Sequence, residues 1–136
     1  MKLPTHSATP LIRTDFSDEA AWLDVLDKAT QTSPEGFVAV LAAIDDRDFQ
    51  NAESDHLAAL AATTTQHALL VVADAETMSN PEHPLLCIDI LPSGGTFRVL
   101  PEQLWGVENN ISAANMDFSE FASAVDSDGV FRGFRD

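Results

Sequence analysis

An unbroken apolar run, Ala68 to Ala73, is the feature of this sequence that most limits how the chain can fold. The run does not alternate between apolar and polar residues, is rich in leucine and valine, and stops at Asp74. A strand with one face in water shows alternation, whereas a strand covered on both faces is apolar throughout. We therefore expect residues 68–73 to form an interior strand of a sheet that carries helices on both faces.

The residues before this run predict two further strands and two helices. Leu11 to Thr14 reads as a strand that ends at Asp15, and Phe37 to Ile44 reads as a second buried strand that ends at Asp45. A helix is expected after each of these strands, because apolar residues there recur at helical spacing. The first helix has Ser17 as its cap and Trp22, Val25, Leu26 and Ala29 on its apolar face, and the second has Leu57, Leu60, Ala61 and Thr64. Connections of this length favour parallel strands in the order β-α-β-α-β.

The residues after the run predict a different arrangement. Residues 85–91 and 96–100 are separated by only four residues, Pro92 to Gly95, which favours an antiparallel hairpin. Helices are expected over 104–111 and after Asp117, whose cap is paired with Glu120. We predict a single α/β domain over residues 1–136: an open, three-layer-like sheet with a parallel β-α-β-α-β start and a C-terminal antiparallel hairpin, followed by helices. Residues 1–8 read as a loose lead-in, and the tail, residues 126–136, is expected to pack back on the domain through its two phenylalanines.

The balance of charge excludes several functions. The sequence contains 22 Asp and Glu residues but only seven Lys and Arg residues, which gives a formal charge of −15. Such a surface repels nucleic acid and anionic lipid and attracts basic proteins. The chain shows no signal-like N-terminus and no apolar stretch of the roughly 20 residues that a membrane span needs, so we expect a cytoplasmic protein without nucleic-acid or membrane binding. The one cysteine, Cys87, lies in an apolar run, where a buried hydrophobe is favoured over a nucleophile, and no cofactor is expected.

Several short segments of the sequence resemble those of a family of small bacterial and fungal domains, domain of unknown function 6924. They are residues 11–22, Ala73-Asp74 with Met78 and His83-Pro84-Leu85, residues 96–99, residues 110–112 and 115–118, and residues 128–133. The resemblance covers nearly the whole chain, except residues 29–60. It implies one domain and brings no activity, cofactor or partner with it.

Carboxylates follow each of the three strands that we expect to be parallel. They are Asp15, the pair Asp45 and Asp46, and Asp74 with Glu76. Ligands of open α/β sheets bind beyond the carboxyl ends of the strands, and clustered carboxylates there can hold Mg²⁺. Asp15, Asp45 and Asp74 are therefore candidate metal ligands. The alternative, which we favour, is that each Asp caps the helix or turn that follows it.

Four other residues are candidates for binding. His83 lies in a turn near Glu76 and Asp74 and could serve as a metal ligand or general acid, but we favour a histidine that lies on the surface or packs a loop. Arg13, Arg98 and Arg132 stand among apolar residues, a setting typical of arginines paired with carboxylates. We expect pairs with Asp15, Asp89 or Asp128; an anion-binding cluster is the alternative.

Two functional hypotheses follow. The first, which we favour because no nucleophile, base and orienting residue can be assembled, is a non-enzymatic acidic protein-interaction module, such as an immunity-type inhibitor or adaptor, that binds a basic partner. The second is a small metal-assisted hydrolase or ligand-binding domain that uses the carboxylates at the strand ends.

Overall fold

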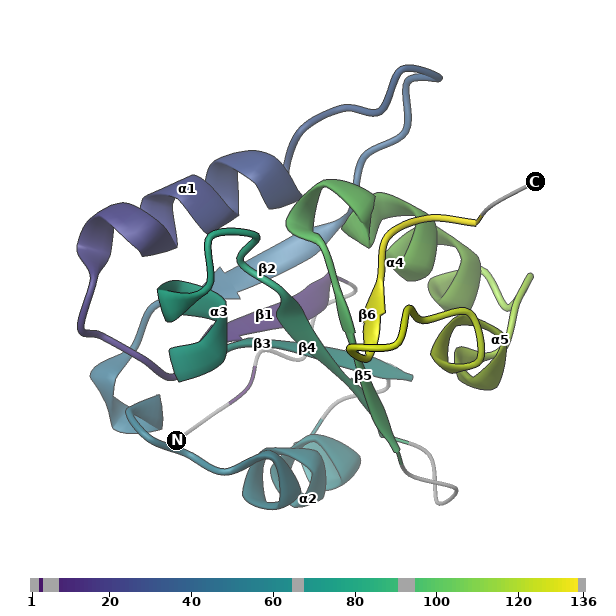
Figure 1. Cartoon of the computed structure of the whole chain (residues 1–136). Helices are drawn as coiled ribbons and strands as arrows, with labels where there is room; N and C mark the ends of the chain where they lie inside the picture. The colour runs from purple at the N-terminus through teal and green to yellow at the C-terminus, as the bar shows by residue number, and fades with distance from the viewer. Residues whose placement is uncertain (1–2, 4–7, 65–67, 91–94, 135–136) are drawn as a thin grey trace.

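A computed structural model describes residue 3 and residues 8–64, 68–90 and 95–134. Six strands form one mixed sheet in the order β2-β1-β3-β4-β5-β6 (Figure 1). The strands are β1 (Thr9–Arg13), β2 (Leu41–Ile44), β3 (Leu69–Ala73), β4 (Leu85–Asp89), β5 (Thr96–Val99) and β6 (Val130–Phe131). The helices are α1 (Glu19–Ala29), α2 (Ser54–Thr64), α3 (Ala75–Ser79), α4 (Leu104–Ser112) and α5 (Phe118–Ala122), with short 3₁₀ turns η1 (Arg47–Phe49) and η2 (Pro101–Gln103).

The parallel β-α-β-α-β start is confirmed. Strand β1 pairs in parallel with β2 on one side and with β3 on the other. All five residues of β3 are buried, and β3 lies between β1 and β4, as the unbroken apolar run predicts.

The second strand is shorter and more exposed than the sequence predicts. Strand β2 covers only Leu41–Ile44 and forms one edge of the sheet over the described residues, so the expectation of a buried strand over residues 37–44 is wrong. Phe37, Val38 and Val40 are 52%, 40% and 56% exposed. An apolar run alone does not distinguish an interior strand from an edge, because position in the sheet depends on which strands come to lie beside it.

The antiparallel hairpin is also confirmed. Strand β4 pairs antiparallel with β3 and with β5. The predicted turn between β4 and β5 falls outside the described residues except for Gly95. Strand β6 is an addition that the sequence reasoning missed: Val130 and Phe131 pair in parallel with Arg98 and Val99 of β5.

Helices cover both faces of the sheet, which gives the predicted three layers (Figure 1). One core cluster lies between the sheet and α1, α3, α4 and α5, with Trp22, Leu104 and Phe121 among its buried residues. The other cluster lies under η1 and α2 and includes Phe49 and Leu57. None of the helices within the described residues is both long and apolar enough to cross a membrane.

The helix caps in the structure agree with those predicted from the sequence only in part. Asp18, not Ser17, caps α1, because its carboxylate accepts from the backbone N–H of Ala21 at 3.0 Å. The predicted pair at the start of α5 is confirmed, since the Glu120 carboxylate accepts from the backbone N–H of Asp117 at 2.8 Å.

Leu3, in the expected loose lead-in, is only 6% exposed. In the tail, Phe131 is 3% exposed and packs edge-on against Phe121. Phe134 is 57% exposed, although its ring also contacts Phe121. The described part of the tail packs back on the domain as expected, but Phe134 stays on the surface.

Candidate functional site

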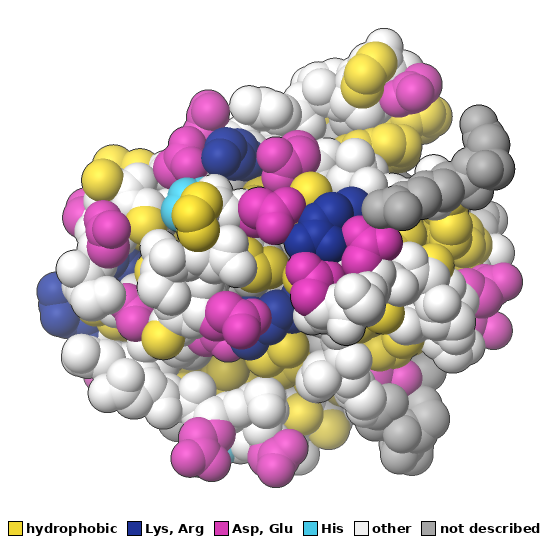
Figure 2. All heavy atoms as spheres, viewed as in Figure 1, with side chains coloured by type: hydrophobic (Ala, Val, Ile, Leu, Met, Phe, Trp, Pro, Cys, Tyr) yellow, Lys and Arg dark blue, Asp and Glu magenta, His cyan; other side chains and the backbone are white. Residues whose placement is uncertain are grey.

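The carboxyl ends of the three parallel strands meet at one edge of the sheet, as they must when the strands share a direction. We call this surface the acidic edge and define it as residues 13–19, 45–48, 53–55, 74–76 and Arg98. The acidic edge holds ten carboxylates and three arginines, which is a formal excess of seven negative charges. The carboxylates are Asp15, Asp18, Glu19, Asp45, Asp46, Asp48, Glu53, Asp55, Asp74 and Glu76, and the arginines are Arg13, Arg47 and Arg98. In Figure 2 acidic side chains are spread over the visible face and surround the few basic ones.

Arg13, at the end of β1, joins two of the strand ends. Its side chain is 3% exposed, and its Nη1 lies 2.8 Å from Glu19 and 3.3 Å from Asp45. Its Nε donates to the backbone carbonyl of Asp15 at 3.0 Å. The expected ion pair between Arg13 and the Asp15 carboxylate is therefore wrong; that carboxylate instead accepts from the backbone N–H and hydroxyl of Ser17.

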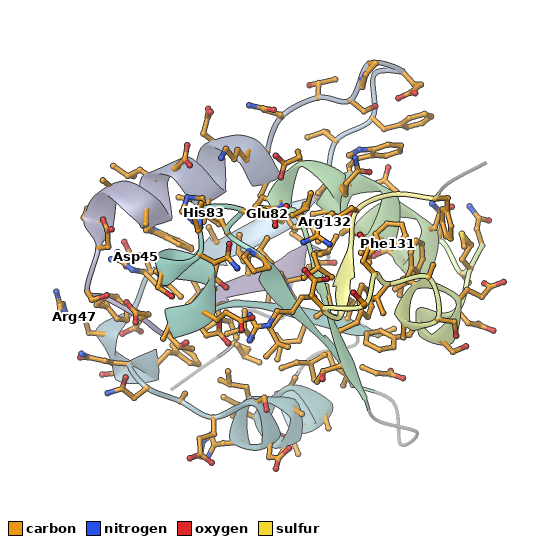
Figure 3. The ribbon with its side chains drawn as sticks, viewed as in Figure 1. Asp45, Arg47, Glu82, His83, Phe131 and Arg132 are labelled. Atoms are coloured by element: carbon orange, nitrogen blue, oxygen red, sulfur yellow. The ribbon has the colours of Figure 1, made fainter. Side chains whose placement is uncertain are left out.

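Phe16 lies between two of the three arginines of the acidic edge. The guanidinium of Arg13 stands 4.4 Å from the ring centroid of Phe16, and that of Arg47 stands 5.0 Å from it. The face of an aromatic ring attracts cations. The ring thus contacts the side chain of Arg47, the first residue of η1, which Figure 3 labels at the left of the molecule.

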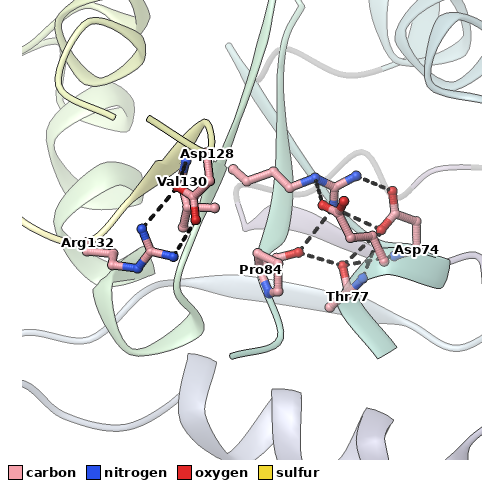
Figure 4. Close-up of polar contacts among 8 residues, drawn as sticks. Asp74, Thr77, Pro84, Asp128, Val130 and Arg132 are labelled. Atoms are coloured by element: carbon pink, nitrogen blue, oxygen red, sulfur yellow. Dashed lines mark hydrogen bonds and ion pairs between the residues drawn. The ribbon is translucent and has the colours of Figure 1, made fainter. Parts of the chain in front are cut away.

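Asp74 is the centre of a second network, at the end of β3 (Figure 4). Arg98 donates to both of its oxygens, at 2.9 and 2.8 Å, and also to the Pro84 carbonyl at 3.1 Å. The Nε of Arg98 lies 2.6 Å from Glu76. Asp74 also caps α3 by accepting from the backbone N–H of Thr77 at 3.1 Å. The expected pair of Arg98 with Asp89 is wrong. Side chains alternate between the two faces of the sheet along β4 and β5, so Asp89 points to the face covered by α1, whereas Arg98 points to the face covered by α2.

Burial and charge act in opposite directions on this pair. Partial burial of Asp74 raises the pKa of its carboxyl, but the hydrogen bonds and positive charge of Arg98, together with the Thr77 hydrogen bonds, lower it more, so the pKa lies below its usual value. Burial lowers the pKa of Arg98, but Asp74 and Glu76 raise it further than burial lowers it. Both groups are therefore charged at neutral pH.

The carboxylates at the strand ends serve as caps or as ion-pair partners of arginines, and Asp74 serves as both. Asp46 and Asp74 are caps, as the favoured alternative predicts: Asp46 accepts from the backbone N–H of Asp48 at 2.9 Å at the start of η1. Asp45 and Glu76 are ion-pair partners of arginines. Within the described residues, no three His, Cys, Asp or Glu side chains gather in an arrangement that could hold a metal ion. The candidate ligands Asp15, Asp45 and Asp74 are thus held by separate partners.

Two hollows open on the acidic edge. The larger, about 480 Å³, has Val72 and Leu86 among its lining, together with Asp74, Arg98 and Glu53 at the start of α2. The second, about 300 Å³, is lined by Asp48, Gln50, Asn51, Ala52, Glu53 and His56. Glu53 lines both, so the two hollows are neighbours at the start of α2.

His83 lies apart from the acidic edge and joins α1 to the β3–β4 connection (Figure 3). Its Nδ1 is 2.8 Å from the carbonyl oxygen of Thr77, and its Nε2 is 3.0 Å from Asp24. Its side chain is 12% exposed and its backbone adopts a positive φ of 53°. These contacts fit a histidine that packs a loop, since both ring nitrogens already have protein partners.

Arg132, which directly follows β6, belongs to a third cluster. It lies within 2.9 Å of Glu82, 2.8 Å of Asp126 and 2.6 Å of Asp128, which confirms the expected pair with Asp128. Arg132 donates hydrogen bonds to all three carboxylates, which raises its own pKa and lowers the pKa of Glu82 and of Asp128. The three arginines therefore do not form the anion-binding cluster that was the alternative, because each is surrounded by its own carboxylates.

Sequence reasoning missed one buried acidic residue. Glu108 of α4 is 3% exposed. Its carboxylate accepts from Thr9 Oγ1 at 3.1 Å, from the Val40 backbone N–H at 2.8 Å and from Ser112 Oγ at 2.6 Å. A signal was present in the sequence, because Glu108 shares the helical face of the apolar residues Leu104 and Ile111.

Fold and contacts together define a single mixed α/β domain whose carboxylates are organised by arginines. The family model for Domain of unknown function (DUF6924) matches residues 8–134, so the chain belongs to that family. No curated protein matches the chain.

Proposed function

We propose that this domain is a non-enzymatic interaction module, an immunity-type inhibitor or adaptor, that binds a basic protein partner at the acidic edge. The observation that carries the proposal is the excess of seven negative charges on one edge of the sheet. An excess of one sign on one surface speeds encounter with an oppositely charged partner and rejects partners of like charge.

The ion pairs at this edge leave a defined part of it open to a partner. Asp48, Glu53 and Asp55 are exposed and have no ion pair to any described residue, whereas Asp45, Asp74 and Glu76 are engaged by arginines. Asp48 and Glu53 also line the hollows at the start of α2. A partner's Lys or Arg side chain would therefore meet free carboxylates there without displacing an existing pair.

The alternative function, a metal-assisted hydrolase or ligand-binding domain, has less support. Both oxygens of Asp74 already accept from Arg98, and a divalent ion at that carboxylate would have to compete with a bidentate guanidinium. The positive charge of Arg98 beside the site would also repel the ion.

Two double variants with the same change in net charge test the proposal. Asp48→Asn/Glu53→Gln neutralises the open part of the acidic edge, and Asp27→Asn/Glu102→Gln neutralises exposed carboxylates on α1 and η2. Each protein serves as bait for affinity purification from the source organism, read by mass spectrometry. A basic protein captured by the wild type and by the control, but lost with the edge variant, is the expected result.

Direct binding of the captured protein, measured over a range of salt concentrations, completes the test. We expect the edge variant to bind more weakly and with a shallower salt dependence, because fewer charges are neutralised in the complex. Equal weakening by both variants would show attraction to net charge alone and would contradict a site at the acidic edge.

A further inference from the structure

Strand β2 leaves one side of its backbone without a partner strand among the described residues, since it ends the sheet order. The N–H of Thr9 donates to the carbonyl of Val40 at 3.0 Å, and Thr9 lies opposite Leu41 in the register. Backbone groups of a strand point alternately to its two sides. The N–H and C=O groups of Leu41 and Ala43 therefore point away from β1.

This edge lacks two of the devices that prevent strands from adding to a sheet. Natural edges are often protected by charged residues and prolines, as well as by bulges or short length. Residues 37–44 contain no charged residue and no proline, in a chain with a formal charge of −15. Phe37, Val38 and Val40 expose about half of their surface, and Figure 2 shows hydrophobic side chains over the loop between α1 and β2.

An apolar hollow adjoins the same segment. The ring of Phe37 stacks on Trp105 of α4, with centroids 5.7 Å apart and planes 8° apart. Together with α4 and the residues after it, these rings line a hollow of about 360 Å³, whose other members are Asn109, Asn110, Ala113 and Asn115. Peptides that extend a sheet gain affinity from backbone hydrogen bonds and specificity from such pockets for single side chains.

The segment that leads into β2 is held in place before any partner arrives. Glu108 accepts from the backbone N–H of Val40 at 2.8 Å, and the side chain of Asn109 donates to the carbonyl of Val38 at 3.0 Å. The Phe37 carbonyl accepts from the N–H of Ser33 at 2.7 Å. A segment fixed in this way loses little further conformational freedom on binding.

The charges beside β2 indicate what it accepts. Asp45 and Asp46 follow the strand directly, and both are exposed. In a second copy of this chain paired antiparallel over Leu41–Ile44, Val40 of one copy would stand beside Asp45 of the other and would offer it no opposite charge. A partner strand with basic residues at that end would instead meet opposite charge.

We propose that β2 is a strand-addition site for an extended partner segment with apolar residues at its centre, Lys or Arg at the end that lies beside Asp45 and Asp46, and one large side chain that enters the hollow beside Trp105. This inference deepens the proposed function and rests on it, because it assigns the basic partner a second contact, away from the open carboxylates of the acidic edge.

Displayed peptide libraries test the proposal. One library carries a randomised apolar and threonine centre between lysine pairs, and the other carries the same centre between glutamate pairs. The strongest peptides are measured by fluorescence anisotropy against the wild type, Ala43→Pro and Ala43→Ser. Proline removes an N–H that points away from β1, whereas serine keeps it, and thermal melts check that both variants fold.

The expected result is enrichment from the lysine library only, with slower amide exchange at Leu41 and Ala43 in the complex. Binding should weaken by about tenfold or more in Ala43→Pro and stay unchanged in Ala43→Ser. Equal binding to Ala43→Pro, enrichment from both libraries or from neither, or a dimer of the protein that Ala43→Pro abolishes would each overturn strand addition. Peptides that bind Ala43→Pro normally but lose affinity for Asp48→Asn/Glu53→Gln would refute this inference and leave the acidic edge as a basic-partner site.

Discussion

Arg98 on β5 reaches past β4 and donates to both carboxylate oxygens of Asp74, at the end of β3. The same carboxylate caps α3. One ion pair therefore connects three adjacent strands and the start of a helix. It also occupies the carboxylate that the sequence most readily suggests as a metal ligand.

The charge of Asp74 should stabilise the fold in a pH-dependent way. Its pKa in the folded protein is below the ordinary aspartate value of about 3.9. A carboxyl whose pKa is lower in the folded protein than in the unfolded chain stabilises the fold at pH values above its pKa in the unfolded chain. This contribution is lost as the pH falls through its pKa in the folded protein. Urea unfolding should show Asp74→Asn less stable than wild type at pH 7, with the gap closing in acid below about pH 3.9. A gap of constant size would contradict this account, and Asp27→Asn is the exposed control.

Replacing Arg98 by lysine should be costly although the charge is kept. A lysine ammonium cannot donate to both Asp74 oxygens in the planar fork of a guanidinium while also serving Glu76 and the Pro84 carbonyl. We expect a loss of about 1–2 kcal/mol in the free energy of unfolding. Wild-type stability in the Arg98→Lys protein would show that the bidentate geometry contributes nothing.

Divalent cations should have no specific effect on stability. Asp45 and Asp74 are held by arginines, so Mg²⁺ or Ca²⁺ at millimolar concentration should act only through general screening. Calorimetric scans of wild type and Asp74→Asn at matched ionic strength should give the same small response. A shift of several degrees in wild type that Asp74→Asn abolishes would favour the metal-assisted alternative.

The same substitution at two valines should separate the interior of the sheet from its edge. Val71 on β3 is 0% exposed, and Val40, which precedes β2, is 56% exposed. Val71→Asp buries a charge without a partner and should cost at least about 3 kcal/mol, measured by urea unfolding. Val40→Asp should change stability by less than about 0.5 kcal/mol. A loss below about 1 kcal/mol at Val71 would be incompatible with an interior position.

Two phenylalanines of the tail should differ in the same manner. Phe131→Ala removes a buried ring and should cost about 3–5 kcal/mol, whereas Phe134→Ala removes a ring that is 57% exposed and should cost far less. Removal of residues 129–136 should destabilise the domain at least as much as Phe131→Ala, because β6 is lost as well. An unchanged melting temperature after the removal would show that β6 contributes nothing to the fold.

The sequence predicts most of the fold because its strongest patterns are local. The apolar run 68–73, the helical spacing around Trp22 and the short link between β4 and β5 each report one element. Position within the sheet is not local, which explains the error at β2. Strand β6 escaped notice because Val130 and Phe131 are too short a run to show a pattern, and they become a strand only beside β5.

The place of the candidate site could be predicted from the sequence, but the ion pairs within it could not. That carboxylates gather at one edge follows from parallel strands that each end in Asp. The partners of Arg13 and Arg98 did not follow, since Glu19 and Asp74 reach them through the path of the backbone and the register of other strands. Neighbouring carboxylates in the sequence, such as Asp15, were the natural but wrong expectation.

Strand β1 has a consequence for how the domain assembles, because both of its partner strands come later in the chain. Leu11 lies opposite Val71, sixty positions further along, whereas β4 and β5 are joined by a short link. Closing a long loop costs entropy before its contacts form, so we expect the β1–β3 pairing to govern the folding rate and the hairpin to form early. The carboxylates that follow β1 and β3 then stay apart through most of folding, and their mutual repulsion is met only in the step that pairs these two strands.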